Sequence, residues 1–169
     1  MKKRQDIIIR QMEPKDFAKV AKLENKNWTS YETPAIIDSS VERYIDEIQS
    51  GIRYFLAVEE TSDEIFAVLV LFDKHRNLST NHKVLTFSPM VIKSARGQGL
   101  GKFLLEFILD YAKDEGYHKI SISVLSTNKV AINIYESANF VIEGIEHKEF
   151  FLNDIWVDNI IYAYFLKEN

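Results

Sequence analysis

The sequence predicts a mixed α/β domain with one parallel crossover, and three observations carry this prediction. Apolar segments of strand length alternate with segments whose apolar residues recur every three or four positions, as in amphipathic helices. A glycine-rich turn, residues 96–101, connects an apolar strand segment (84–92) to a long helical segment (100–111). A further strand segment, 119–125, follows, so the two strands are expected to run parallel with the helix as their crossover.

The chain is expected to begin with a strand and two helices. Alternating isoleucines predict the strand at residues 7–9, and the Glu-Pro pair at 13–14 is a helix start. Ser39 and Glu42 form a capping-box pattern for a second helix, which runs to about residue 50 and is closed by Gly51. The apolar side of the first helix consists of Phe17, Val20, Ala21 and Trp28.

A hairpin and a polar loop are expected to precede the glycine-rich turn. Residues 53–59 and 64–72 have strand patterns, and the polar tetrad 61–64 between them is typical of a hairpin turn. The loop over 73–82 then leads to the strand at 84–92.

The long helix and the elements after it complete the predicted order. Its apolar stripe consists of Leu100, Phe103, Leu104, Phe107, Ile108 and Tyr111, and Gly116 ends it. Ser126 or Thr127 is expected to cap the next helix, which carries Tyr135. Two strands, 141–151 and 155–165, close the chain with Asn153-Asp154 as their turn.

Composition limits the class of protein without choosing a function. A chain of 169 residues that is 46% hydrophobic and 27% charged suits one domain, expected over 7–169 after a short tail at 1–6. The lack of Cys excludes a disulfide scaffold, a cysteine nucleophile and thiolate metal sites. No apolar leader or 18-residue apolar run is present, so we predict a cytoplasmic protein that neither spans a membrane nor is secreted.

Net charge argues weakly against nucleic acid as a partner. The formal charge is −4, whereas nucleic-acid binding depends on Lys and Arg that neutralise phosphates. The basic cluster Lys2, Lys3 and Arg4 is short and is interpreted as a solvated tail. An acidic body favours a cationic substrate such as an amine.

The turn at 96–101 has the character of an anion-binding loop. Gly97, Gly99 and Gly101 let the backbone approach a ligand closely, and the helix that follows aims its free N–H groups at the same point. The dinucleotide fingerprint fails because Lys102 stands where its third glycine should be. The P-loop fails because only three residues separate Gly97 from Gly101. A phosphorylated cofactor of another class is therefore expected.

Two motifs together resemble the GNAT superfamily of N-acetyltransferases. The first is Arg-x-x-Gly-x-Gly, beginning at Arg96. The second is Asn-x-x-Ala-x-x-x-Tyr-x-x-x-Asn-Phe over 128–140, which matches the family pattern except that Asn139 replaces glycine. Asn tolerates the left-handed conformation that ends a helix, so we expect the helix to end there. Ala67 and Lys93 are two further departures, where many members have glycine and proline.

The resemblance implies a fold and an activity. The fold is a mixed central sheet of about seven strands with about four helices on its faces, over nearly the whole chain. Two central strands splay apart in this fold, and Pro89 is a candidate for the bulge that opens them. The implied activity is direct transfer of an acetyl group from acetyl-CoA to a primary amine in a ternary complex, with no metal.

The resemblance also implies the site residues. Tyr135 would be the general acid toward the sulfur of CoA, although its place on an apolar helical face also fits simple packing. Asn128 would contact the cofactor arm or order a water, and it could also cap the helix. The cofactor-binding residues would be Met90 and Val91 through their backbone, with a backbone N–H near Val91 polarising the carbonyl, and Arg96, Gly97, Gln98, Gly99, Leu100, Gly101 and Asn128.

Several assignments stay open. The general base could be Glu24, Glu32, Glu149 or a water chain. The loop over 28–40 should cover the acceptor, for which a small polyamine or amino sugar, an amino acid and a protein N-terminus are all candidates. A CoA-binding sensor without catalysis and an interaction module of the same fold are the alternatives.

Histidines 75, 82, 118 and 147 show no metal spacing and are expected at the surface. A homodimer through the closing hairpin is possible, through Phe150, Phe151, Tyr162 and Tyr164.

Overall fold

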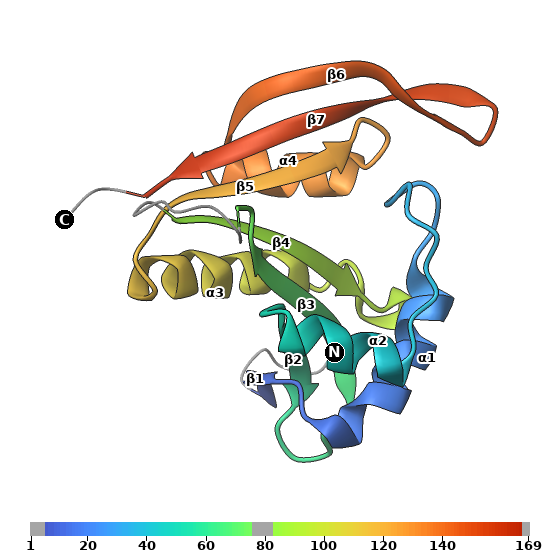
Figure 1. The fold of residues 1–169 in the computed structure, drawn as a ribbon, viewed down its shortest axis with the longest axis vertical. Helices are drawn as coiled ribbons and strands as arrows, with labels where there is room; N and C mark the ends of the chain where they lie inside the picture. Colours follow the sequence, from blue (N-terminus) through green and yellow to red (C-terminus); the bar gives the residue numbers. More distant parts are fainter. Residues whose placement is uncertain (1–5, 76–82, 167–169) are drawn as a thin grey trace.

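The computed structural model describes residues 6–75 and 83–166, which form one seven-stranded sheet with helices on both faces (Figure 1). The strand order is β1-β2-β3-β4-β5-β7-β6, and every neighbouring pair is antiparallel except β4 and β5. The strands are β1 (Ile7–Gln11), β2 (Arg53–Glu59), β3 (Ile65–Asp73), β4 (Lys83–Val91), β5 (Tyr117–Leu125), β6 (Val141–Leu152) and β7 (Ile155–Phe165). The predicted parallel crossover is therefore confirmed.

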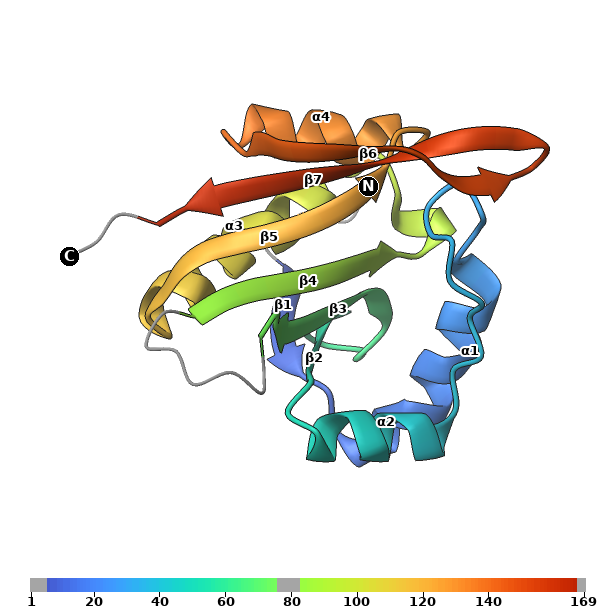
Figure 2. The same ribbon diagram turned by 45° about the horizontal axis from the view of Figure 1, so that its top comes forward.

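Four α-helices cover the sheet, two on each face (Figure 2). On one face lie α1 (Phe17–Asn27), which follows a 3-10 turn at Pro14–Asp16, and α2 (Val41–Gln49). On the other face lie α3 (Leu100–Asp114) and α4 (Lys129–Ser137). Leu100, Leu104 and Ile108, which share one stripe of α3, are all buried, as their spacing predicts.

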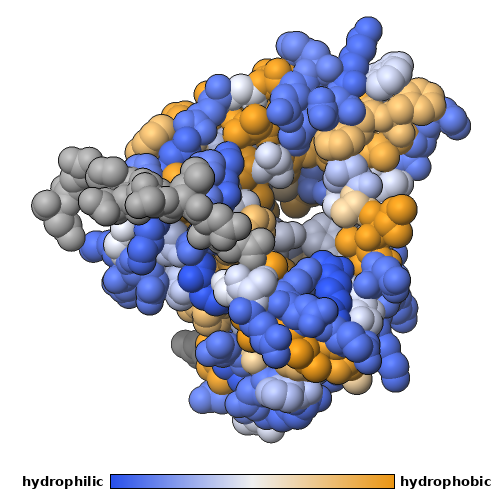
Figure 3. Space-filling view, viewed as in Figure 1, coloured by the Kyte–Doolittle hydropathy of each residue, from blue (hydrophilic) through white to orange (hydrophobic). Residues whose placement is uncertain are grey.

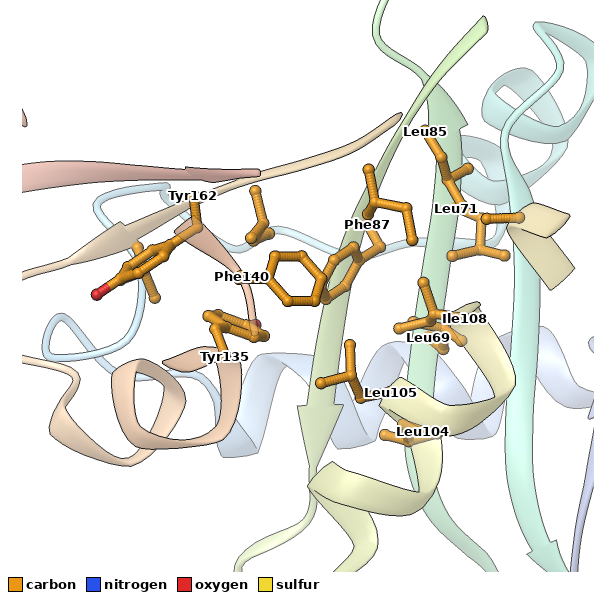
Figure 4. Close-up of a cluster of buried hydrophobic side chains, with 14 of the residues drawn as sticks. Leu69, Leu71, Leu85, Phe87, Leu104, Leu105, Ile108, Tyr135, Phe140 and Tyr162 are labelled. Atoms are coloured by element: carbon orange, nitrogen blue, oxygen red, sulfur yellow. The ribbon is translucent and has the colours of Figure 1, made fainter. Parts of the chain in front are cut away.

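A buried cluster between α3, α4 and the sheet forms the core beside the expected site (Figure 4). Leu104 and Ile108 of α3 pack there with strand residues such as Leu69, Leu85 and Phe87. Such burial of apolar surface is the main stabilising contribution to folding, at about 25 cal/mol per Å². A second cluster on the opposite face packs α1 and α2 against β2, β3 and β4.

One predicted helix cap is wrong by one residue, and among the three candidates for another the structure selects Asn128. The cap of α2 is Ser40, whose Oγ accepts a hydrogen bond from the Arg43 N–H at 3.2 Å, because Ser39 turns its hydroxyl to Glu24 instead. The cap of α4 is Asn128, whose side chain accepts a bond from the Ala131 N–H at 3.2 Å, in place of Ser126 or Thr127.

The predicted turn chemistry is confirmed where the backbone is left-handed. Asn139, which follows the C-cap residue Ala138 of α4, adopts φ 64°, so it ends the helix as glycine would. Asn153 and Asp154 adopt φ 51° and 62°, the conformation of a tight turn between β6 and β7.

Parts of the predicted chain lie outside the described residues: Lys2, Lys3 and Arg4 with most of the tail at 1–6, much of the loop 73–82, and His82. No helix within 6–75 and 83–166 has the length and apolar character needed to cross a bilayer.

Candidate functional site

The central strands β4 and β5 are paired over only part of their length. Their register runs from Lys83–Tyr117 to Thr86–Ser121, and β4 continues to Val91 without a partner on that side. The pairing of β3 with β4 is regular through Pro89, which lies opposite Leu69, so no bulge in the β3–β4 pairing opens the strands there. The gap begins instead where the β4–β5 pairing stops.

The end of β4 has no β5 partner for its backbone groups in this gap. The Ile92 N–H donates to the Phe66 carbonyl at 3.0 Å, across to the β3 side. Because successive residues of a strand point their N–H and C=O groups to opposite edges, Met90 also faces β3 and Val91 faces the gap. Val91 thus offers the backbone N–H that a ligand lying along β4 could bind.

The glycine-rich turn forms a cradle at the start of α3. Gly97 and Gly99 have φ of 72° and 81°, which side chains with a Cβ rarely adopt. Helix α3 begins at Leu100, so the N–H groups of its first turn have no partner within the helix. A Cβ on Gly101 would lie 2.8 Å from Cδ1 of Ile134, so this glycine lets α3 and α4 pack closely.

One cavity of about 450 Å³ joins the cradle to the gap. The structure brings nearly every predicted site residue to it, from four separate elements. Gln98 is the exception, because it does not line the cavity and its side chain donates to the Ser94 carbonyl at 3.1 Å. The predicted residues that line the cavity are Met90, Val91, Arg96, Gly97, Gly99, Leu100, Gly101, Asn128 and Tyr135.

Tyr135 belongs to α4, and its side chain forms part of the wall of this cavity. Its side chain is 4% exposed and packs against Phe87 and Phe140, with ring centroids 5.7 and 5.6 Å apart (Figure 4). Its hydroxyl has no hydrogen-bond partner among the described residues. Burial raises the pKa of the phenol, so the hydroxyl stays protonated at neutral pH and can donate a proton. The aromatic packing and a chemical role are therefore compatible.

Arg96 acts as a brace in addition to lining the cavity. Its Nε donates to the Val91 carbonyl at 3.0 Å, and its Nη2 donates to the Asn27 carbonyl at 3.3 Å. Its Nη1 lies 2.8 Å from Oε1 of Glu32. The guanidinium thus ties the end of β4, the end of α1 and the loop after it to the cradle.

The three candidate bases have different surroundings. Both carboxylate oxygens of Glu32 are engaged, one with Arg96 and the other by the hydroxyl of Thr29 at 2.9 Å. Glu149 is exposed on β6 and lines neither cavity described here. Glu24 is 5% exposed on α1 and accepts hydrogen bonds from Ser39 and Tyr44. Burial and a polar setting therefore single out Glu24 among the three.

A second cavity, of about 310 Å³, lies on the opposite side of β4. Glu24, Arg43 and Glu47 line it, together with Ser88 of β4. Trp28 at the end of α1 lines both cavities. On this face the surface is hollowed between the β6–β7 hairpin and α2 (Figure 3). Sequence reasoning noted Glu24 but missed its partners, because a residue of the next helix supplies one of them.

The remaining candidates give no metal site. Within 6–75 and 83–166, no three His, Cys, Asp or Glu side chains are grouped to hold a metal ion. His75 and His147 are exposed, as predicted, whereas His118 is partly buried. Tyr162 is buried beside Tyr135, so the expectation that it could contribute to a dimer contact is wrong.

Comparison with known proteins agrees with this geometry. The chain is 29% identical over 123 residues to glucosamine 6-phosphate N-acetyltransferase of Arabidopsis thaliana, covering 70% of this chain and 80% of that protein. The structure of smu.2055 from Streptococcus mutans UA159 superposes with a TM-score of 0.86 at 32% identity, covering 95% of this chain and 99% of that one. The structure of yncA from Salmonella typhimurium with its cofactor acetyl-CoA superposes with a TM-score of 0.76 at 20% identity, covering 97% and 96%.

A family model settles the relationship. The acetyltransferase (GNAT) domain model matches residues 9–161, which include the cradle, the gap in the sheet and Tyr135. The chain therefore belongs to the GNAT acetyltransferase family, and it is an acyltransferase by that membership.

Proposed function

We propose that this protein transfers an acetyl group from acetyl-CoA to a primary amine, by direct attack in a ternary complex. The observation that carries the proposal is the single cavity that joins a phosphate-type cradle, an unpaired strand edge and a buried phenol hydroxyl. Each of these features suits a different part of the same cofactor.

The residues present fit acetyl-CoA. The positive-φ glycines and the first turn of α3 would hold the pyrophosphate through backbone N–H groups. The edge of β4 that faces the gap would lie along the pantetheine arm, with the Met90 side chain lining the same cavity and the Val91 N–H left for the thioester carbonyl. Asn128 lines the cavity and caps α4 at once, so it could contact the arm without giving up its structural role.

Tyr135 is the group that we assign to protonate the leaving sulfur. Bound acetyl-CoA would supply a thioester carbonyl as the electrophile. The acceptor would react as the free amine: its nitrogen would bond to that carbonyl carbon as the carbon–sulfur bond breaks, and the Tyr135 hydroxyl would give its proton to the sulfur. The proton that the nitrogen loses would pass to water, from which Tyr135 would regain one. A Val91 N–H in the gap would stabilise the negative charge that develops on the carbonyl oxygen. The chain has no Cys, so we assign no covalent enzyme intermediate.

The acceptor is proposed to be a small-molecule or peptide amine. A relative is named for an amino sugar phosphate, and solved neighbours include ones named for spermidine and for ribosomal-protein alanine. These names span several classes of amine, so they do not select one acceptor for this chain.

A second copy of the chain is the protein partner that we propose. Phe151 and Trp156, near the tip of the β6–β7 hairpin, stack with ring centroids 5.2 Å apart although they are 58% and 60% exposed. Light scattering of the wild type and of Trp156→Ser would test whether this aromatic pair is buried in a contact between two copies of the chain. A cytoplasmic location and the lack of a nucleic-acid or membrane partner stay predictions from composition.

Two measurements test the proposed function. Isothermal titration should detect acetyl-CoA binding, and the melting temperature should rise with its concentration because a ligand of the folded state adds RT ln(1 + [L]/Kd) to stability. Release of free thiol should then be followed across a panel of amines. Binding without thiol release on any amine would favour a CoA-binding sensor, whose aromatic packing around Tyr135 would be purely structural. No binding at millimolar acetyl-CoA would contradict both functions.

A further inference from the structure

Within the described residues, only one of the two carboxylate oxygens of the buried Glu24 accepts hydrogen bonds. Its Oε2 accepts both hydrogen bonds, from the Ser39 hydroxyl at 2.5 Å and from the Tyr44 hydroxyl at 2.9 Å. Its Oε1 has no partner among the residues that the structure describes, and the side chain lines the second cavity. Oε1 is not fully enclosed by the protein, so it can accept a hydrogen bond from a cation that enters this cavity.

The charged groups around Glu24 do not provide that cation. Arg43 reaches the Ser39 hydroxyl at 3.4 Å, but its ion pair is with Glu47, with 2.9 Å between Nε and Oε1. The hydroxyl of Tyr54 donates to the other oxygen of Glu47. Arg43 and Glu47 therefore neutralise each other, and Glu24 leaves the cavity with one surplus negative charge.

The rest of this cavity suits an apolar body. The indole of Trp28 stands at the wall that both cavities share, where it can also face a cation. The apolar residues that line the cavity are Trp28, Ala35, Ile37, Ile52, Val70 and Phe72.

The position of the cavity connects it to the proposed reaction. Ser88 of β4 lines the second cavity, whereas its neighbours Phe87 and Pro89 line the first. The two cavities thus lie on opposite sides of the same short stretch of β4, next to the gap where that strand has no partner. Because Trp28 lines both cavities, a molecule held in the second cavity would lie next to the first.

We propose that Glu24 binds the ammonium group of the acceptor through Oε1, and that the acceptor is a compact primary amine with an apolar body and no anionic group. This inference rests on the proposed acetyl transfer and names its substrate class. A phosphate or carboxylate in the cavity would lie near two carboxylates and would have to take Arg43 away from Glu47. Glu24 is thereby the residue that determines specificity for charge.

Matched pairs of ligands test the inference on the CoA-loaded protein. One pair is 2-phenylethylamine and phenylalanine, which share a body and differ by a carboxylate. The other is glucosamine and glucosamine 6-phosphate. In calorimetry, the wild type should bind 2-phenylethylamine with a Kd at least about tenfold lower than its Kd for phenylalanine. The reason is that the carboxylate of phenylalanine would lie near the negatively charged Glu24.

Two variants separate the roles of the carboxylates. Glu24→Gln keeps the shape of the side chain and removes its charge. It should raise the Kd for 2-phenylethylamine about tenfold and reduce the preference for 2-phenylethylamine over phenylalanine, while the Kd for CoA stays unchanged. Glu47→Gln is the matched control in the same cavity. It frees Arg43, so it should improve binding of phenylalanine relative to 2-phenylethylamine.

The outcomes distinguish this inference from the function on which it rests. A wild type that binds acetyl-CoA but prefers the anionic members overturns the inference and leaves the proposed function standing. Equal binding of 2-phenylethylamine by wild type and folded Glu24→Gln also overturns it. If Glu24→Gln does not fold by circular dichroism, the wild-type preference and the opposite shift in Glu47→Gln decide. Failure of the wild type to bind acetyl-CoA would instead contradict the proposed function.

Discussion

Arg96 and Glu32 form an ion pair in which Nη1 and Oε1 lie 2.8 Å apart. The pair joins the cofactor cradle to the loop that follows α1. The same loop is held at two further points, by the Thr127 hydroxyl on the Tyr31 carbonyl at 3.3 Å and by the Ser30 hydroxyl on Oδ1 of Asn153 at 3.0 Å. The loop is thus fastened to three elements that surround the site.

The engagement of Glu32 predicts that it is not the general base. Both of its oxygens are taken, so Glu32→Gln should keep kcat within about threefold of the wild type. Loss of a half-exposed ion pair should lower the free energy of unfolding by about 0.2–1 kcal/mol. Steady-state kinetics and urea unfolding measure the two effects, with Glu149→Gln as the exposed control. A loss of kcat beyond about a hundredfold would instead assign Glu32 to proton transfer.

Removing the Tyr135 hydroxyl should slow the reaction without loosening the protein. We expect Tyr135→Phe to lower kcat about a hundredfold, the low end for general acid catalysis, because that hydroxyl has no structural partner among the described residues. The Kd for acetyl-CoA and the melting temperature should stay the same. Tyr162→Phe is the control from the same cluster, since it loses a hydroxyl that bonds to Glu136 at 2.9 Å. An activity within twofold of wild type in Tyr135→Phe would remove Tyr135 from the mechanism.

The pH profile gives a separate test of Tyr135. Burial raises the pKa of this phenol above its ordinary value of about 10. A raised pKa keeps the acid form present at higher pH, so deprotonation of Tyr135 should not lower kcat between about pH 8 and pH 10. A falling limb in that range that is absent from Tyr135→Phe would show that the phenol titrates there.

Gly97 and Gly101, at opposite ends of the cradle, should respond differently to substitution by alanine. Gly97 has open space around it but φ of 72°, so Gly97→Ala should cost about 1–2 kcal/mol through the backbone alone. Gly101→Ala should cost about 1–3 kcal/mol through its contact with Ile134. Ile134→Val removes the Cδ1 that the new methyl meets. It should therefore rescue Gly101→Ala in denaturant unfolding and leave Gly97→Ala unchanged, and equal rescue of both would contradict this assignment.

Acid should destabilise the fold in part through Asp16. Burial raises the pKa of this carboxyl, but hydrogen bonds from Arg10 at 2.7 and 2.9 Å and from the Glu13 N–H outweigh it and leave the pKa lowered. A lowered pKa gives stability that is present above the unfolded value of about 4 and is lost as pH falls through the folded value. Urea unfolding from about pH 6 to pH 2 should show a steeper decline for wild type than for Asp16→Asn. Parallel slopes would mean that other carboxyls account for the decline.

The sequence could predict what depends on local spacing. The apolar stripe of α3 and the strand patterns give the order of elements, because burial on one face imposes a period on the chain. Asn139 could be assigned to a helix end because its left-handed preference is a property of the residue itself. Tyr135 and the cradle could be proposed as site residues from the sequence for a similar reason, because each lies in a motif of fixed spacing.

The rest of the site depends on contacts between distant segments. The partner of Glu32 is sixty-four positions away, as 96 − 32 = 64, and no local pattern links Glu32 to Arg96. Ser39 and Ser40 are equivalent as local caps, and only the buried carboxylate of Glu24 takes Ser39 out of that role. Residues whose function depends on such long-range competition are visible only once the sheet is assembled.

The ladder between β4 and β5 has fewer residue pairs than any other in the sheet, so the two halves of the sheet are most weakly joined at its middle. On one side of that point lie β1 to β4 with α1 and α2, and on the other lie β5 to β7. Past the Thr86–Ser121 pair, β4 and β5 form no further ladder pairs within the described residues. A molecule that lies in this gap would bridge the two halves of the sheet where the β4–β5 hydrogen bonds are missing. Binding of such a molecule should therefore slow amide hydrogen exchange in both halves at once.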